Sequence, residues 1–366
     1  MKKLLTAQIV GALLALTPFL CDPIATFADD GAREYYVSVD GNDANSGASE
    51  TDALKTLERA RDLIRAQRAS GASGEFVVRL GAGEFVRTAT FQLTAEDAHT
   101  RYVGTPGETV VSAGVDIKDW KVATSDQKKG FPNADEAIWV AKTPQVAGTT
   151  FYFEQLFVGE NRAIRARFPN EGFLRPESVW QDGSIQKPAN ENGVAQAIIA
   201  KKGDLDALDL TNIKPSELRF AQFVVHHHWD TTRRILLGYD QATRALKAQG
   251  APMKHWNPWR DTSMYYLENL RTAFDAPGEW FYAGDEGLVY YRPRKDENIK
   301  TTRFVAPYPG VRRLLTINGK DANGKSTDVD IRFENIRFVY SDAPRDRNVM
   351  ASAALAITLR SRGASE

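Results

Sequence analysis

The sequence predicts a mostly β fold in which short strands stack as the coils of a parallel β-helix. Three observations lead to this prediction. A single strongly helical segment, residues 51–68, precedes the strands, as a cap at the open end of a solenoid would. Short strands of four or five residues then follow at regular spacing from residue 76 to residue 112. Similar short strands return after residue 302, beyond a long segment with a different rhythm.

The first 28 residues are typical of a secretory signal peptide. Lys2 and Lys3 give a positive start, residues 4–20 form an apolar run, and Ala28 supplies a small residue at the cleavage position. No later segment is apolar enough to span a bilayer. We therefore expect cleavage after Ala28, a periplasmic or extracellular location, and no membrane attachment of the mature chain.

Two alternatives for this segment are less favoured. A membrane anchor would need a longer run than one interrupted by Pro18, and a lipid-modified Cys21 would need small residues where Phe19 and Leu20 stand. Cys21 is the only cysteine, so the mature chain would carry no thiol. That excludes disulfides, thiolate zinc sites and a cysteine nucleophile.

The mature chain is predicted to open with a strand and a helix. Residues 35–39 alternate as a strand does and run into the turn residues 40–43, which lack the spacing of a calcium loop. Residues 51–68 then place apolar side chains at helical spacing with arginines opposite, up to the Gly/Ser-rich segment 70–74.

The strands that follow are too closely spaced for crossover helices. They are expected at residues 76–80, 90–93, 101–103 and 109–112. Two arrangements remain, antiparallel hairpins or a solenoid that stacks strand on strand. Two-residue hairpin turns are scarce, which favours the solenoid.

The middle of the chain is predicted to be an inserted antiparallel β domain. It is richer in Pro, Trp and Tyr, has a longer predicted strand at 151–158, and includes a hairpin around residues 284–287. We place the N-terminal cap and first coils at residues 29–120, the insertion at 121–300 and the resumed β-helix at 301–366. Its strands are expected at 314–317, 329–333, 336–339 and 356–359.

Composition limits the possible partners. Apolar residues at 42% and charged residues at 26% are globular values, and 47 Lys+Arg balance 47 Asp+Glu. There is no net field to attract nucleic acid or an acidic membrane. We expect a monomer that uses no cofactor and no metal and binds a polysaccharide or oligosaccharide.

Several stretches resemble a known family. The opening strand, turn and helix at residues 35–62 resemble the start of exported parallel β-helix carbohydrate enzymes. Residues 165–170, 266–269 with 277–281, and 288–293 narrow this to glycoside hydrolases of family 141 and their relatives near family 120. The resemblance covers residues 34–366. It implies a right-handed parallel β-helix with an inserted β domain, and retaining or inverting glycosidase chemistry on a plant or microbial polysaccharide.

The resemblance also implies where catalysis would occur. In such enzymes the catalytic carboxylates lie on later coils, so no catalytic residue can be carried over to this chain. We expect the sequence to represent the N-terminal part of such an enzyme, with the catalytic residues unknown.

Binding residues are predicted around a histidine run. On a strand, His226 and His228 would point one way, with Asp230 on the same face. Two such histidines could bind zinc or contact sugar hydroxyls, but their spacing is not that of hydrolytic zinc sites. The substrate-binding candidates are His226, His228, Trp229, Asp230, Trp256 and Trp259.

Acidic and basic residues offer weaker candidates. Asp328 and Asp330 would share a strand face, and Glu279 sits beside Trp280 in the predicted hairpin, where structural roles are favoured. Arginines such as Arg233 could neutralise a uronate in a polysaccharide lyase, with calcium held by aspartates. The alternatives to a glycoside hydrolase are therefore such a lyase and a non-catalytic carbohydrate-binding or structural fragment.

Overall fold

The computed structural model describes residues 33–180, 194–250, 253, 257–320, 324–327 and 329–342. In this part of the chain the fold is mostly β, which confirms the coarse prediction. The predicted signal peptide at 1–28 and the predicted strand at 356–359 lie outside the described residues. No helix in the described residues is long and apolar enough to cross a membrane.

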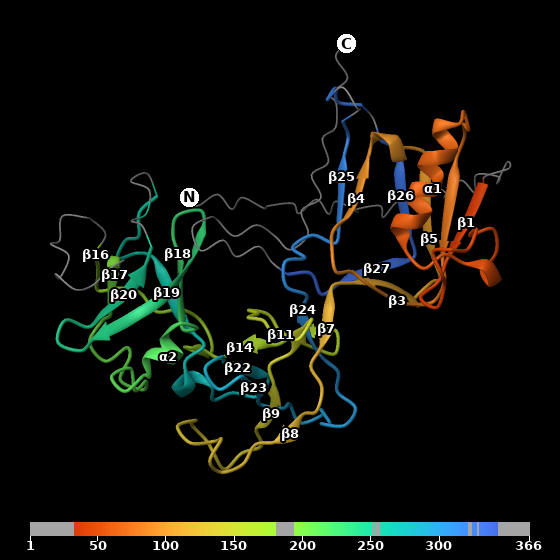
Figure 1. Ribbon diagram of the computed structural model, residues 1–366. Helices are drawn as coiled ribbons and strands as arrows, with labels where there is room; N and C mark the ends of the chain where they lie inside the picture. The colour runs from red at the N-terminus through yellow and green to blue at the C-terminus, as the bar shows by residue number, and fades with distance from the viewer. Residues whose placement is uncertain are drawn as a thin grey trace, which may run out of the picture.

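Nine short strands form three parallel sheets at one end of the molecule (Figure 1). The first sheet has the order β1 (Arg33–Val37), β2 (Phe76–Leu80), β5 (Thr100–Gly104) and β26 (Ile331–Glu334). The second holds β3 (Gly83–Val86), β6 (Thr109–Ser112) and β27 (Ile336–Val339), and the third β4 (Phe91–Thr94) and β25 (Leu315–Asn318). Every pair in these sheets is parallel, so antiparallel hairpins are excluded for these strands.

The register of these sheets locates the insertion. Phe76 pairs with Thr100, a separation of 24 residues, and Thr100 pairs in turn with Ile331. Strands far apart in the sequence therefore lie side by side, and the residues between β6 and β25 leave the stacked strands and return to them. We call these nine strands the parallel stack and the residues from β7 to β24 the insertion.

The insertion is built mainly from antiparallel pairs. Its largest sheet has the order β15-β21-β18-β19-β20-β17-β16, with bounds β15 (Arg167–Phe168), β16 (Ser178–Trp180), β17 (Val194–Ile199), β18 (Gln222–His226), β19 (Thr231–Asp240), β20 (Ala245–Gln249) and β21 (Met264–Glu268). Its second sheet has the order β14-β22-β23-β9-β8, with bounds β8 (Lys121–Val122), β9 (Trp139–Lys142), β14 (Ile164–Arg165), β22 (Glu279–Ala283) and β23 (Leu288–Tyr291). Within these two sheets only the β14–β22 pair is parallel.

Two smaller sheets complete the insertion. β13 (Asn161–Arg162), β12 (Phe157–Val158), β24 (Phe304–Pro307) and β7 (Gly114–Asp116) form one sheet, and β10 (Gln145–Val146) pairs with β11 (Thr149–Thr150). The predicted hairpin around residues 284–287 is confirmed, because β22 and β23 pair antiparallel. The predicted long strand at 151–158 is wrong, since only its last two residues, β12, are a strand.

The predicted helix is α1 (Leu57–Ala69), which begins later than the pattern suggested. Thr56 caps it, with Oγ1 accepting a hydrogen bond from the Arg59 N–H at 3.1 Å. Leu57, Ala60 and Ile64 are buried against the core of the parallel stack. The other helical segments are single turns: α2 (Pro215–Leu218), η1 (Glu50–Asp52), η2 (Ala95–Asp97) and η3 (Arg271–Ala273).

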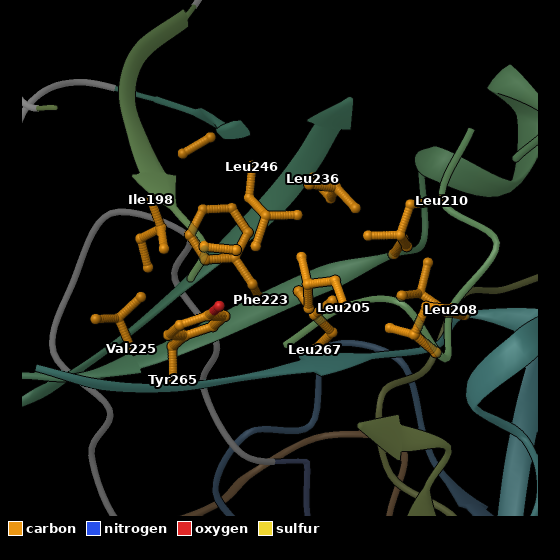
Figure 2. Close-up of a cluster of buried hydrophobic side chains, with 14 of the residues drawn as sticks. Ile198, Leu205, Leu208, Leu210, Phe223, Val225, Leu236, Leu246, Tyr265 and Leu267 are labelled. Atoms are coloured by element: carbon orange, nitrogen blue, oxygen red, sulfur yellow. The ribbon is translucent and has the colours of Figure 1, made fainter. Parts of the chain in front are cut away.

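The parallel stack and the large insertion sheet have separate cores. In the stack, Tyr102 is fully buried between Phe333, stacked at 5.0 Å, and Phe91, edge-on at 5.6 Å. In the insertion, alternate residues of β18 and β21 such as Phe223 and Leu267 point into a second core (Figure 2). The side chains between them therefore point to the opposite face of this sheet.

Candidate functional site

The histidine run forms a hairpin turn. β18 ends at His226, so residues 227–230 leave the strand, and the expectation that His226, His228 and Asp230 share a strand face is wrong. The reason is a local bond: the buried His227 ring places Nε2 2.7 Å from Asp230 Oδ1, and the His227 N–H donates to the Asp230 carbonyl at 3.0 Å. These contacts close the turn.

A second segment holds this turn in place. His227 Nδ1 lies 3.1 Å from the carbonyl oxygen of Asn257, whose Nδ2 donates to Asp230 Oδ1 at 2.9 Å. The fixed turn leaves Trp229 59% exposed, with its ring edge-on to His228 at 4.8 Å. Of the predicted binding residues, Trp229 and His228 are thus at the tip of the turn, while Asp230 serves to hold it.

His226 faces away from the insertion core. Its Nδ1 bonds the Thr231 hydroxyl across the hairpin at 2.8 Å, and no described residue bonds its Nε2. Burial lowers the pKa of the imidazole, and the positive charges of Arg233 and Arg167 lower it further. The ring is therefore neutral at pH 7 and can both donate and accept a hydrogen bond.

Two rings and an arginine gather around His226, and we call the four residues the sheet-face cluster: Arg167, Phe173, His226 and Tyr266. The His226 ring lies 5.0 Å from Phe173 and 5.9 Å from Tyr266, measured between ring centroids. The guanidinium carbon of Arg167 lies 4.0 Å from the Tyr266 ring centroid and 5.8 Å from that of Phe173. Phe173 is 45% exposed, so the cluster opens to solvent.

A charged network lies next to this cluster on the same face of the sheet. Arg233 on β19 pairs with the buried carboxylate of Glu268 on β21, and its other Nη lies 3.4 Å from the Tyr266 hydroxyl. Gln222, the cross-strand partner of Glu268, donates to Glu154 at 2.6 Å. Arg233 is thus committed to an ion pair, unlike the substrate-neutralising arginine considered for a lyase.

The network extends to the junction of the two insertion sheets. Arg165 on β14 is 5% exposed and donates to the Tyr152 hydroxyl at 3.1 Å and the Phe220 carbonyl at 3.0 Å. The Tyr152 hydroxyl donates in turn to Glu154 at 2.8 Å. Two arginines and two glutamates balance in charge here, which suits a buried structural network.

Glu279 is a buried carboxylate that accepts hydrogen bonds from three backbone N–H groups. It is 1% exposed, and it accepts from the backbone N–H groups of Arg167, Asp275 and Ala276 at 3.1, 3.0 and 3.0 Å. Burial raises its pKa to about 7 and outweighs these three donors. Because it holds the backbone of Arg167, Glu279 positions the sheet-face cluster.

The other sequence candidates are dispersed. Trp259 is 1% exposed in the insertion core, edge-on to Phe223 at 5.6 Å, so it packs rather than faces solvent. Trp256 and Asp328 lie outside the described residues. Asp330 lies on the parallel stack, 3.3 Å from the Arg332 guanidinium. The described residues contain no group of three or more His, Cys, Asp or Glu placed to hold a metal ion.

Sequence reasoning missed three members of the cluster. Arg167 and Tyr266 fall in the stretches that carry the family resemblance, but their meeting depends on the Arg167–Glu268 register of β15 with β21. Phe173 lies in a segment between β15 and β16, where the sequence has no regular apolar alternation that would single it out. The available signal was an exposed aromatic after a Gly-containing loop, which is too common to select it.

Comparison with known proteins finds a family model that matches most of the insertion. Residues 136–294 match the family model described as the GH141 insertion domain. This match confirms the resemblance to glycoside hydrolases of family 141 within the insertion.

A solved structure shares the fold of this chain. A structure titled "Glycoside hydrolase" matches 89% of this chain and 53% of its own, with a TM-score of 0.64 and 21% identity. The chain therefore spans about half the length of that structure. A second, titled "The complex structure of XylC with xylose", matches 83% of this chain and 40% of its own at 10% identity, with a TM-score of only 0.24. No curated protein matches the sequence.

Proposed function

We propose that this chain is the N-terminal part of an exported glycoside hydrolase of family-141 type that acts on a plant or microbial polysaccharide. One observation carries the proposal: the segment that matches the GH141 insertion domain lies between β6 and β25, two strands of the parallel stack. A domain with this family relationship, placed inside stacked parallel coils, is the architecture that the resemblance implies.

The proposal includes the finer architecture. The parallel stack is the start of a right-handed parallel β-helix with α1 as its cap, and residues 121–300 form an antiparallel domain within the insertion. The 24-residue period between β2 and β5, and the continuation of the same register into β26, support this. We further propose that residues 1–28 direct export and that catalytic carboxylates are supplied by further coils.

The insertion then acts in substrate binding. The sheet-face cluster offers an exposed aromatic ring for the apolar face of a sugar, and a neutral imidazole and an arginine for its polar groups. Trp229 at the tip of the β18–β19 turn adds a second exposed ring. Such pairing of aromatic and polar groups is how proteins contact carbohydrate rings.

The test is an assay, on a panel of polysaccharides, of the longer protein that includes the further coils with the catalytic carboxylates. Each reaction is followed for new reducing ends and for absorbance of an unsaturated product, with and without a calcium chelator. The proposal predicts reducing ends without that absorbance. Absorbance that the chelator abolishes would instead identify a lyase, and binding without turnover would identify a non-catalytic module.

A further inference from the structure

We infer that the sheet-face cluster is a binding subsite for a carboxylated sugar, a hexuronate unit of a polysaccharide. The inference rests on the proposed function and names the substrate class of that same site. It comes from the balance of charge in the cluster and from its size.

The charge balance leaves one cation without a carboxylate. Glu268 is committed to Arg233, whereas Arg167 bonds only carbonyl oxygens, with Nε donating to Pro169 at 2.9 Å and Nη2 to Gly172 at 2.7 Å. Among the described residues no carboxylate forms an ion pair with Arg167. Its Nη1 is therefore available, and a guanidinium binds a carboxylate better than any neutral group.

The neighbouring histidine adds a polar group without a charge. Arg167 and Arg233 both lower the pKa of His226, and the charge of Arg233 is itself paired with Glu268. The neutral ring offers Nε2 to a ligand as a donor or acceptor. An anionic sugar would thus meet the positive charge of Arg167, which a neutral sugar would not use.

The size of the cluster suits one pyranose ring. The centroids of Phe173, His226 and Tyr266 lie within 6.0 Å of one another, and the Arg167 guanidinium lies within 5.8 Å of both outer rings. The exposed face of Phe173 can take the C–H face of the sugar, which leaves its carboxylate to point at Arg167.

Hydrogen bonds to the loop after β15 hold the Arg167 side chain beside the rings. Its two carbonyl acceptors, Pro169 and Gly172, belong to the loop that carries Phe173, so one side chain orders the loop and presents a free N–H beside the ring. The backbone N–H of Arg167 is held in turn by Glu279. The subsite is therefore built before a ligand arrives, which lowers the entropic cost of binding.

The experiment compares two forms of one polymer. The full chain is titrated with homogalacturonan oligomers, either de-esterified or fully methyl-esterified, so that only the negative charge differs. We expect about tenfold tighter binding of the de-esterified form, a preference that decreases as salt is added. Equal affinity for the two forms, or no binding of either, overturns the inference.

Variants assign the effect to the cluster. Arg167→Gln should abolish the preference and Arg167→Lys should keep part of it, while Arg162→Gln serves as a matched control. Arg162 is an exposed arginine that lies 5.6 Å from the Phe157 ring and outside the cluster. A preference that survives Arg167→Gln overturns the inference. Unfolding midpoints are measured for each variant.

Phe173→Ala keeps the test valid if Arg167→Gln disturbs the loop. Because the ring is 45% exposed, its removal should leave the fold intact and weaken both polymer forms about fivefold. Unchanged binding contradicts the subsite. The outcome is separate from that of the proposed function: hydrolysis of neutral polysaccharide without any preference for charge would sink this inference alone, and binding without hydrolysis would sink only the hydrolase.

Discussion

The parallel stack and the insertion use their strands differently. In the stack, equivalent residues of successive coils lie on one another, as Val78 lies beside Tyr102 and Tyr102 beside Phe333. In the large insertion sheet only one face is apolar, and the other carries the sheet-face cluster and its charged network. The same packing arrangement therefore repeats from coil to coil in the stack, whereas the large insertion sheet has one face that carries polar and charged side chains. In our proposal, the described stack is the scaffold and the insertion carries the sugar-facing surface.

The largest expected effect tests whether the two cores are separate. Phe223→Ala removes a fully buried ring from the insertion core and should cost about 3–5 kcal/mol. Hydrogen exchange should then lose protection in β18–β21 while β2 and β5 keep theirs. Phe76→Ala in the stack is the matched control, with the reverse pattern. Equal loss in both regions from either variant would show one cooperative core.

Asn269 tests how the two insertion sheets are joined. It is fully buried with a φ of 57°, its Oδ1 accepts from the Tyr282 N–H at 2.8 Å, and its Nδ2 donates to the Tyr282 carbonyl at 3.0 Å. Asn269→Gly should cost about 2 kcal/mol through the two lost bonds, and Asn269→Ala about 1 kcal/mol more because of the positive φ. Chemical denaturation measures both, and equal costs would contradict the strain.

Glu279 gives a pH-dependent effect in the insertion. Its pKa is raised from 4.5 to about 7 in the folded state, so its contribution to stability is present below pH 4.5 and is lost as the pH rises through 7. Between pH 4 and pH 8 the wild type should lose about 3 kcal/mol relative to Glu279→Gln. Unfolding free energies at several pH values measure this difference. A difference that stays constant with pH would contradict the raised pKa of the buried Glu279 carboxyl group.

The smallest effect is expected where the stack meets the insertion at the surface. Arg337 on β27 pairs with Glu160, and these side chains are 43% and 71% exposed. Arg337→Gln should change the unfolding free energy by less than about 1 kcal/mol, because solvent and salt screen such pairs. A loss of several kcal/mol on denaturation would mean that this contact couples the two regions.

Sequence patterns predicted the stack better than the site. The predicted bounds of β2 and β6 agree with the structure at both ends. Each strand is a short apolar run that can be recognised locally, and glycine marks the turn that follows it. The strand expected at 151–158 failed because Phe153 stacks on Trp280 at 5.2 Å and Tyr152 bonds Glu154, so side chains hold this segment in place of a backbone ladder. Such contacts depend on the fold and leave no period in the sequence.

The site was predicted only in part for the same reason. His226 and Trp229 were found because a histidine run is unusual, but the strand assumed there ends where His227 turns to Asp230. Arg167 and Phe173 join His226 only through the pairing of β15 with β21 and the loop beyond it. Register and loop conformation are properties of the folded chain.

The most direct test of the central claim is a hydrogen-exchange footprint of the whole chain with de-esterified homogalacturonan oligomers. If the insertion carries the sugar-facing surface, the ligand should slow exchange in residues 165–175, 222–232 and 264–268 and leave β2, β5 and β26 unchanged. Protection confined to the strands of the parallel stack would contradict the account.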